Sequence, residues 1–278
     1  YQVKFDQGMI NRGNWKKIKE CMKKAERGED ITTGFLGGSI TQGSLSSTPQ
    51  TCYAYLVYEW WKKKFPESEI TFVNAGIGGT TSQFGVSRVK EHLLSYQPDF
   101  VLIEFAVNDE NTEFFEETYE GLVRTTLSDA CRPAVRYDDG LNAEEMHLKV
   151  AKAYALPMVS MKETIWPEIE SGRIKNREIT PDDLHPNDAG HALVAKVITT
   201  FLEKVYEDRN NEEEAAFAEG ILPAPESSHA IRVAIDEALK CKETGETKTI
   251  VFGLTGTGYF DMTAYQKFND GEMSDYIP

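Results

Sequence analysis

Cysteines are scarce in this sequence and none lies close to another. The four residues Cys21, Cys52, Cys131 and Cys241 are spread over 278 positions without a Cys-x-x-Cys pair. This spacing argues against a zinc knuckle and against a disulfide framework. We therefore expect a reducing compartment and predict a cytoplasmic protein. The residues from Tyr1 also lack the basic and apolar regions of a signal peptide, although a trimmed leader stays open because residue 1 is not Met.

Long apolar runs and an excess of positive charge are also missing. No apolar run approaches the length of a membrane span. Acidic residues outnumber basic ones 45 to 30, which gives a formal net charge of −15. This charge disfavours nucleic acids and anionic membrane surfaces as partners and favours neutral substrates such as sugars and small esters. We predict no nucleic-acid or membrane partner, and the oligomeric state stays open.

Short apolar runs alternate with helical patterns through the first 205 residues. A hydrophobic fraction of 40% is that of a folded globular protein. Strands are expected over 31–36, 70–75, 100–107 and 156–161, and helices over 14–27, 53–65, 83–96, 116–127, 142–154 and 188–205. This alternation predicts an α/β fold, a three-layer α/β/α sandwich with a parallel sheet.

One strand of that sheet is largely missing from the sequence. A doubly wound domain should have a buried strand between residues 127 and 142, yet only Pro133-Ala134-Val135 is apolar there. Three explanations stay open: neighbouring segments close the gap, residues are absent from this chain, or the fold is compromised.

A run of acidic residues over 207–214 marks a candidate domain boundary, because like charges at that density stay solvated. We predict a main domain over 1–208, with residues 1–30 as an N-terminal lead-in helix. Residues 209–278 would form a C-terminal appendage with a helix over 231–241 and a strand over 249–254. Such a fragment is too small to bury a core of its own.

Ser39 is the first candidate for chemistry. It follows Gly37-Gly38 at a strand end and precedes a helical stretch, at the carboxyl edge of a parallel sheet where ligands collect. A helix N-cap serine is the alternative interpretation.

Two further segments follow strands at the same predicted edge. Residues 74–81 contain Gly76, Gly78 and Gly79, whose backbone N–H groups could approach an anion, and a phosphate-binding loop is disfavoured because no Gly-Lys-Ser/Thr follows. Asn108 comes directly after the strand over 100–107 and supplies an amide donor, or is simply a turn residue.

The fourth signal is Asp182, three residues before His185 and just ahead of the last helix of the main domain. Helix capping by Asn187 or Asp188 explains part of this string but not the histidine. A metal site built with His191 is not expected, because a spacing of six places the two rings on different helix faces. The remaining histidines, His92, His147 and His229, are interpreted as surface or packing residues.

Together these segments resemble the four signature blocks of the SGNH (GDSL-like) hydrolase family. The blocks are residues 37–41, 76–79, 107–109 and 182–185, and the resemblance covers about residues 9–208. It implies a serine ester hydrolase with a triad of Ser39, Asp182 and His185. It also implies an oxyanion hole formed by the N–H groups of Ser39 and Gly79 and by the Asn108 amide, with no metal or cofactor.

The strings over 45–49, 58–61 and 108–115 are similar to bacterial carbohydrate esterases that deacetylate plant glycans. An acetylated oligosaccharide or another small ester is therefore the expected substrate. A thioesterase or lysophospholipase of the same family, or a carbohydrate-binding protein with a dead site, are the alternatives. Trp60, Trp61 and Trp166 are candidates either for stacking on sugars or for buried packing.

The tail resembles a different family. Residues 219–230 and 253–261 are similar to the C-terminal part of tryptophan-synthase-beta-like enzymes, which use pyridoxal phosphate. The resemblance would place Thr255 near the cofactor ring nitrogen. The Schiff-base lysine and the phosphate loop of that family belong to earlier segments that have no counterpart here, so no cofactor is expected and the tail is interpreted as a fused structural appendage.

Overall fold

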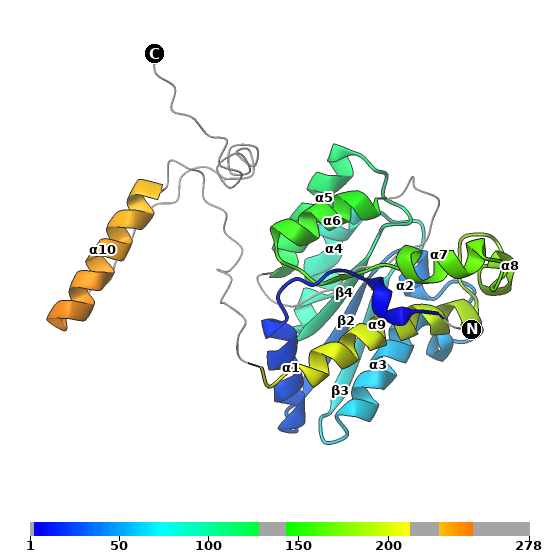
Figure 1. Ribbon diagram of the computed structural model, residues 1–278, viewed down its shortest axis with the longest axis horizontal. Coiled ribbons are helices and arrows are strands. Elements are labelled where there is room, and N and C mark those ends of the chain that lie inside the picture. Colours follow the sequence, from blue (N-terminus) through cyan, green and yellow to red (C-terminus); the bar gives the residue numbers. More distant parts are fainter. Residues whose placement is uncertain (1–2, 128–142, 212–227, 247–278) are drawn as a thin grey trace, which may run out of the picture. The chain divides into compact units, whose positions relative to one another are not determined.

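The computed structural model describes residues 3–127, 143–211 and 228–246 (Figure 1). The chain divides into two compact units, Tyr1–Phe217 and Ala218–Pro278. The predicted boundary at 208 stays a prediction. In the second unit the described part is helix α10 (Ser228–Thr244) and the two residues after it. The predicted strand over 249–254 and Thr255 lie outside the described residues.

A parallel three-stranded sheet forms the centre of the first unit. Its strands are β2 (Ile31–Gly37), β3 (Ile70–Gly76) and β4 (Phe100–Glu104), in the order β3-β2-β4. Gly37, the last residue of β2, pairs with Gly76 on one side and Glu104 on the other. The chain runs from β2 to β3 on one side and then crosses back to β4 on the other side of β2. The carboxyl end of β2 is therefore a topological switch point, where ligand sites form in such sheets.

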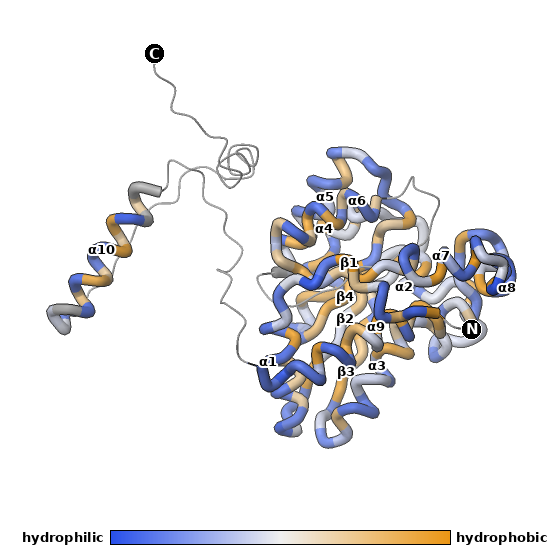
Figure 2. The backbone as a smooth tube through the Cα atoms, in the orientation of Figure 1, coloured by the Kyte–Doolittle hydropathy of each residue, from blue (hydrophilic) through white to orange (hydrophobic). Residues whose placement is uncertain are grey.

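Helices cover both faces of this sheet and complete a three-layer sandwich. Alternate strand residues point to opposite faces, so that Phe35 and Leu36 belong to different core clusters. Figure 2 shows hydrophobic residues along the strands and hydrophilic ones on the outer turns of the helices. One face carries α1 (Lys16–Glu26), α3 (Tyr53–Lys64) and α9 (Asp188–Glu207), and the other carries α4 (Ser82–His92), α5 (Glu113–Leu127) and α6 (Glu144–Ala153). The predicted α/β/α sandwich is confirmed.

Two predicted strands differ from the structure. The strand expected over 100–107 ends at Glu104, because the Phe105 carbonyl accepts the N–H groups of both Asn108 and Asp109 and turns the chain. The strand expected over 156–161 shrinks to β5 (Met158–Val159), which pairs antiparallel with β1 (Met9–Asn11) outside the parallel sheet. Residues 128–142, where the sequence lacks most of an expected strand, lie outside the described residues.

Short elements connect these layers. They are α2 (Ser39–Gln42), α7 (Lys162–Glu170), α8 (Asn176–Ile179) and the 3-10 turns η1 (Phe5–Gly8), η2 (Pro49–Thr51) and η3 (Leu94–Tyr96). In the described part of the chain, Cys52 and Cys241 are free thiols. Over the same residues, no helix combines the length and the apolar character that a membrane crossing needs.

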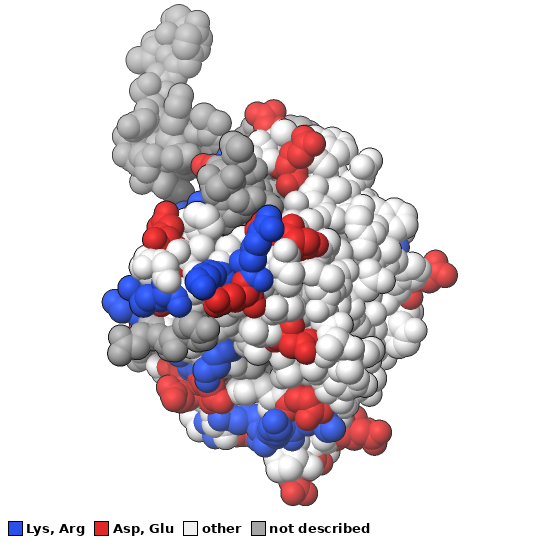
Figure 3. Space-filling model, turned by 90° about the vertical axis from the view of Figure 1, so that its right-hand side faces the viewer, with Lys and Arg blue, Asp and Glu red and all other residues white. Residues whose placement is uncertain are grey.

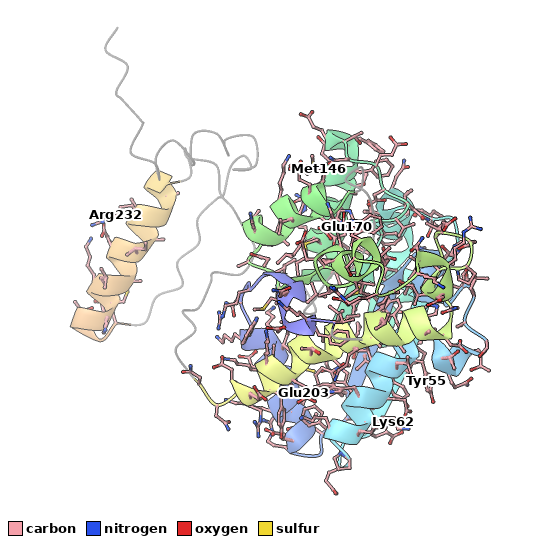
Figure 4. All side chains as sticks on the ribbon, turned by 45° about the vertical axis from the view of Figure 1, so that its right-hand side comes forward. Tyr55, Lys62, Met146, Glu170, Glu203 and Arg232 are labelled. Atoms are coloured by element: carbon pink, nitrogen blue, oxygen red, sulfur yellow. The ribbon has the colours of Figure 1, made fainter. Side chains whose placement is uncertain are left out.

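The tryptophans on α3 pack inside the first unit. Trp61 is fully buried, with its ring centroid 5.3 Å from those of Phe65 and Phe100. The neighbouring Trp60 is half-buried and donates its indole N–H to Glu203 of α9, at 2.7 Å (Glu203 is labelled in Figure 4). Both residues therefore join α3 to its surroundings. The third tryptophan considered for sugar stacking, Trp166, is half-buried on α7.

Replacing Trp61 by alanine should strongly destabilise the first unit. Truncating a fully buried Trp costs about 3–5 kcal/mol of unfolding free energy, because a large cavity remains. The adjacent, exposed Lys62 (Figure 4) is the matched control, and Lys62→Ala should change stability by less than about 0.5 kcal/mol. Urea unfolding measures both, and equal midpoints for the two variants would contradict this packing.

Candidate active site

Ser39 opens helix α2 at the end of the central strand. Only Gly38 separates it from the last residue of β2, so it lies at the switch point of the sheet. The Asn74 side chain, from the end of β3, donates to the Thr41 carbonyl at 2.8 Å and holds the short helix in place. The side chain of Ser39 is thereby presented at the carboxyl edge, with the residue 9% exposed.

Asp182, His185 and Ser39 form one line of hydrogen bonds. His185 Nε2 lies 2.9 Å from Ser39 Oγ, and His185 Nδ1 lies 2.7 Å from Asp182 Oδ2. The other oxygen of Asp182 accepts the backbone N–H groups of Leu184 and His185. The bond to the His185 ring, followed by these backbone bonds, lowers the pKa of Asp182 to about 2, so it is a carboxylate over the whole working range of pH.

A strained residue shapes the turn between Asp182 and His185. Asp183 has a left-handed backbone, with φ +63°, which Asp tolerates better than most residues. Its side chain is anchored outside the turn, where Arg177 of α8 donates to it at 2.6 Å. The turn folds the chain back so that the Asp182 carboxylate reaches both the backbone and the ring of His185.

The glycine segment after β3 lies beside Ser39. A Cβ built on Gly78 would be 3.7 Å from the Ser39 Cβ, and the Gly78 N–H donates to Gln42 Oε1 on α2. Gly79 has φ +70°, a conformation that glycine adopts without strain. Among the described residues, the N–H groups of Ser39 and Gly79 have no hydrogen-bond acceptor, so both remain available to a ligand.

Asn108 reaches the same place from the turn after β4. Its Nδ2 donates to the Thr80 carbonyl at 2.8 Å, and a Cβ on Gly38 would lie 3.2 Å from that nitrogen. An amide nitrogen carries two hydrogens, and one remains after the bond to Thr80. The structure therefore brings the five predicted site residues together: Ser39, Gly79, Asn108, Asp182 and His185.

This arrangement can carry out nucleophilic chemistry. A hydroxyl within hydrogen-bond reach of an imidazole can lose its proton to the ring as it attacks, and a carboxylate on the other ring nitrogen fixes the tautomer. Donors that have no acceptor of their own can hold an oxygen that becomes negative during the reaction.

A second group of contacts, which the sequence did not reveal, pins the loop after α2 to the start of α9. Asp188 accepts from the Ser47 N–H at 2.7 Å, and from the hydroxyls of Ser47 and Thr51 at 2.6 Å each. These bonds, first of all the one with the Ser47 hydroxyl, lower the pKa of Asp188 to about 2. The segments that follow Ser39 and His185 are thus tied to each other.

His191, one turn further along α9, holds the same loop. Its Nδ1 accepts the Tyr53 N–H and its Nε2 faces the Ser44 carbonyl, both at 3.2 Å. This pair of partners requires a neutral ring with the proton on Nε2. Burial lowers the pKa of His191, which favours the same form. From the sequence, His191 was weighed only as a metal ligand, a role that was not expected.

Arg88, on α4, fixes the ends of two strands from the sheet face opposite α9. The residue is 4% exposed, and its guanidinium donates to the carbonyls of Ala75, at 2.6 Å, and Gly37, at 3.1 Å. Both carbonyls lie at the carboxyl ends of β3 and β2, just before the glycine segment and Ser39. In the sequence, the spacing of three between Gly85 and Arg88 places both on one face of the helix, and this is the signal for an inward-facing arginine.

No group of three or more His, Cys, Asp or Glu side chains that could hold a metal ion occurs within residues 3–127, 143–211 and 228–246.

His147, interpreted from the sequence as a surface or packing residue, is fully buried and bonded to Asp109 at 3.0 Å. Its position on the apolar side of α6, three and four residues before Val150 and Ala151, is the pattern that indicates this burial.

One face of the molecule carries charges of both signs. Figure 3 views the molecule from the side where α7 and α8 are labelled in Figure 1. Acidic and basic side chains are interspersed there, and broad areas carry neither. A face of this kind suits an uncharged ligand better than a polyanion.

Comparison with known families shows the family of the chain. A sequence model of the GDSL-like lipase/acylhydrolase family matches residues 35–193. The chain belongs to this family. The match contains Ser39, Gly79, Asn108, Asp182 and His185, and it confirms the resemblance that the sequence blocks indicated.

Solved structures of esterases share the fold of the family. A two-domain esterase active on acetylated mannans, co-crystallised with mannopentaose, is 57% identical with a TM-score of 0.74, over 78% of this chain and 61% of that one. This chain thus spans less than two thirds of that relative. An acetylxylan esterase from Geobacillus stearothermophilus, 19% identical with a TM-score of 0.51, covers 65% of this chain and 96% of its own, and it supports the fold alone.

The tail shows the second similarity that the sequence indicated. Tryptophan synthase beta chain 2 of Aquifex aeolicus is 67% identical over 60 residues, which are 22% of this chain and 14% of that protein. The corresponding protein of Methanosarcina acetivorans is 66% identical over 58 residues. These matches cover a small part of an enzyme outside the GDSL-like family.

Neutralising Asp188 should reduce thermal stability in a pH-dependent manner. Its pKa is about 2 in the folded protein against a usual value of 3.8, so its contribution is complete above pH 3.8 and is lost as the pH falls towards 2. The melting temperature of Asp188→Asn should lie below that of the wild type at pH 6, and the difference should shrink below pH 4. Melting curves between pH 2.5 and 7 test this, and a constant difference would contradict it.

Proposed function

We propose that this protein is a serine esterase that removes short acyl groups, namely O-acetyl groups, from carbohydrates. The observation that carries the proposal is the continuous line Asp182–His185–Ser39, which ends beside donors that have no acceptor within the described chain. In this proposal Ser39 is the nucleophile, His185 the general base and Asp182 the residue that orients its ring. The N–H groups of Ser39 and Gly79 and the amide of Asn108 form the oxyanion hole.

The reaction proceeds through an acyl-enzyme in two halves. Ser39 Oγ attacks the ester carbonyl carbon while His185 Nε2 takes its proton, and the tetrahedral intermediate collapses when His185 returns that proton to the departing sugar oxygen. Water then attacks the acetyl-serine, again deprotonated by His185, and acetate leaves as Ser39 regains its proton. Each half passes through an oxyanion that the three donors stabilise.

An acetylated oligosaccharide is the substrate we propose. The support is the 57% identical relative that is active on acetylated mannans. The interspersed charges of the face in Figure 3 suit such a neutral chain. No cofactor or metal takes part in the proposed steps. The tail, which resembles only a small part of tryptophan synthase, has no role in them and is interpreted as a structural appendage.

Longer acyl groups are the second candidate, in a thioesterase or lysophospholipase. Leu184, the residue before His185, is 41% exposed, and Leu45, in the loop after α2, is 48% exposed. Two leucines that lie close in sequence to the nucleophile and the base could contact an acyl chain. A p-nitrophenyl ester series separates the candidates, because the acetylesterase should prefer acetate over octanoate.

Ser39→Ala should abolish hydrolysis of p-nitrophenyl acetate without loss of fold. Triad residues act as a unit, and removing the nucleophile costs about 10⁶ in kcat in a related constellation. The variant should also lose covalent labelling by a fluorophosphonate. Residual activity above 1% of wild type, or unchanged labelling, would exclude Ser39 as the nucleophile.

A wild type that melts cooperatively yet neither hydrolyses the ester nor reacts with the probe would favour the binding protein with a dead site.

Asn108→Ala should lower kcat far more than it raises KM. The amide would act mainly on the oxyanion, and loss of one such donor costs about 10²–10³ in kcat. Steady-state kinetics on p-nitrophenyl acetate measure both constants. An unchanged kcat with a raised KM would assign Asn108 to ground-state binding.

A further inference from the structure

We propose that Asp109, held by His147, is a positioning residue for the Asn108 amide. This inference rests on the proposed esterase function and assigns a role to a buried pair that the reaction itself does not use. The pair is 3.0 Å apart, between Asp109 Oδ2 and His147 Nε2, and both side chains have 0% exposed surface.

Asp109 connects two loops that each supply a proposed oxyanion donor. Its Oδ1 accepts the N–H of Ser82, the first residue of α4, at 2.8 Å, across the sheet edge. The preceding residue, Asn108, makes the parallel contact to the Thr80 carbonyl at 2.8 Å. Two adjacent side chains from the β4 turn therefore hold one short segment after β3, one through an N–H and the other through a carbonyl.

This double attachment determines where the Asn108 amide points. The bond to Thr80 engages one amide hydrogen and directs the other, but it forms only if the two loops keep their separation. That separation is maintained by Asp109, because its backbone continues directly from Asn108 while its carboxylate is fixed on α4. Gly79 precedes Thr80, so the same attachment sets the distance between the two donors.

His147 makes the attachment rigid. Its ring stacks on Tyr119 of α5 at 3.6 Å between centroids and 12° between planes. The imidazole is thus confined in orientation, and its Nε2–H holds the second carboxylate oxygen of Asp109. Burying a carboxylate is costly unless its oxygens are bonded, and both oxygens of Asp109 are.

Kinetics of three variants test the proposal on p-nitrophenyl acetate. Asp109→Ala releases the β4 turn from α4, and we expect kcat to fall about 100-fold, as for loss of an oxyanion donor, with KM within twofold. Asp109→Asn keeps the shape but offers one acceptor in place of two, and kcat should fall about 10-fold by the same reasoning. Thr118→Val is the control. It removes the 2.7 Å bond between the Thr118 and Ser82 hydroxyls and the 3.3 Å bond from Thr118 to the Phe115 carbonyl, and it should keep kcat within twofold.

A double-mutant cycle distinguishes positioning from mere structural support. If Asp109 acts through Asn108, adding Asp109→Ala to Asn108→Ala should lower kcat less than threefold further, since residues that act through one another are not additive. Independent 100-fold losses in both backgrounds would overturn the proposal. So would a cooperatively melting Asp109→Ala with kcat within twofold of wild type.

Should Asp109→Ala fail to melt cooperatively, Asp109→Asn takes its place in the cycle. Equal losses of about 10-fold in both backgrounds, or a kcat within twofold of wild type, would then overturn the proposal. Wild type and Ser39→Ala are assayed alongside. An inactive wild type would sink the esterase function itself, whereas a Ser39-dependent activity that ignores Asp109 would sink only the positioning role.

Discussion

The hydrogen bond between Ser39 Oγ and His185 Nε2 is the contact that the surrounding structure of the first unit holds in place. It joins residues 146 positions apart, one on the helix after the central strand and one in the turn before α9. Each end is fixed by its own contacts: Asn74 and Arg88 hold the segment around Ser39, and the Asp182 carboxylate binds the His185 ring and backbone. Asp188 and His191 then connect the two ends, so that their separation does not rely on the sheet alone.

Much of this could be predicted from the sequence, because the strongest signals were local. Continuous apolar runs that end in glycine or asparagine gave the order of strands and turns, and the carboxyl ends of parallel strands meet at one edge. Ser39, Gly79 and Asn108 follow directly from that rule, and the spacing of Asp182 and His185 places them within one turn of chain.

The rest depends on partners distant in the sequence. Nothing near Asp188 indicates that Ser47 and Thr51 donate to it, since the capping role of Asn187 and Asp188 already explains those residue types. The length of β5 was overestimated from the sequence, because the apolar residues over 156–161 also fit a central strand. Its actual extent depends on its pairing with β1 near the N-terminus. The tie between Asp109 and His147 likewise joins residues 38 positions apart.

The distance along the chain between Ser39 and His185 also affects the order in which the site is assembled. During synthesis the β2–α2 segment emerges first, and the turn with Asp182 and His185 emerges only after β3, β4 and the helices of the second face. A nascent chain therefore carries Ser39 long before it carries His185, and loops that long close slowly. In the proposed mechanism, Ser39 gains its base only once the turn before α9 has reached the end of the central strand.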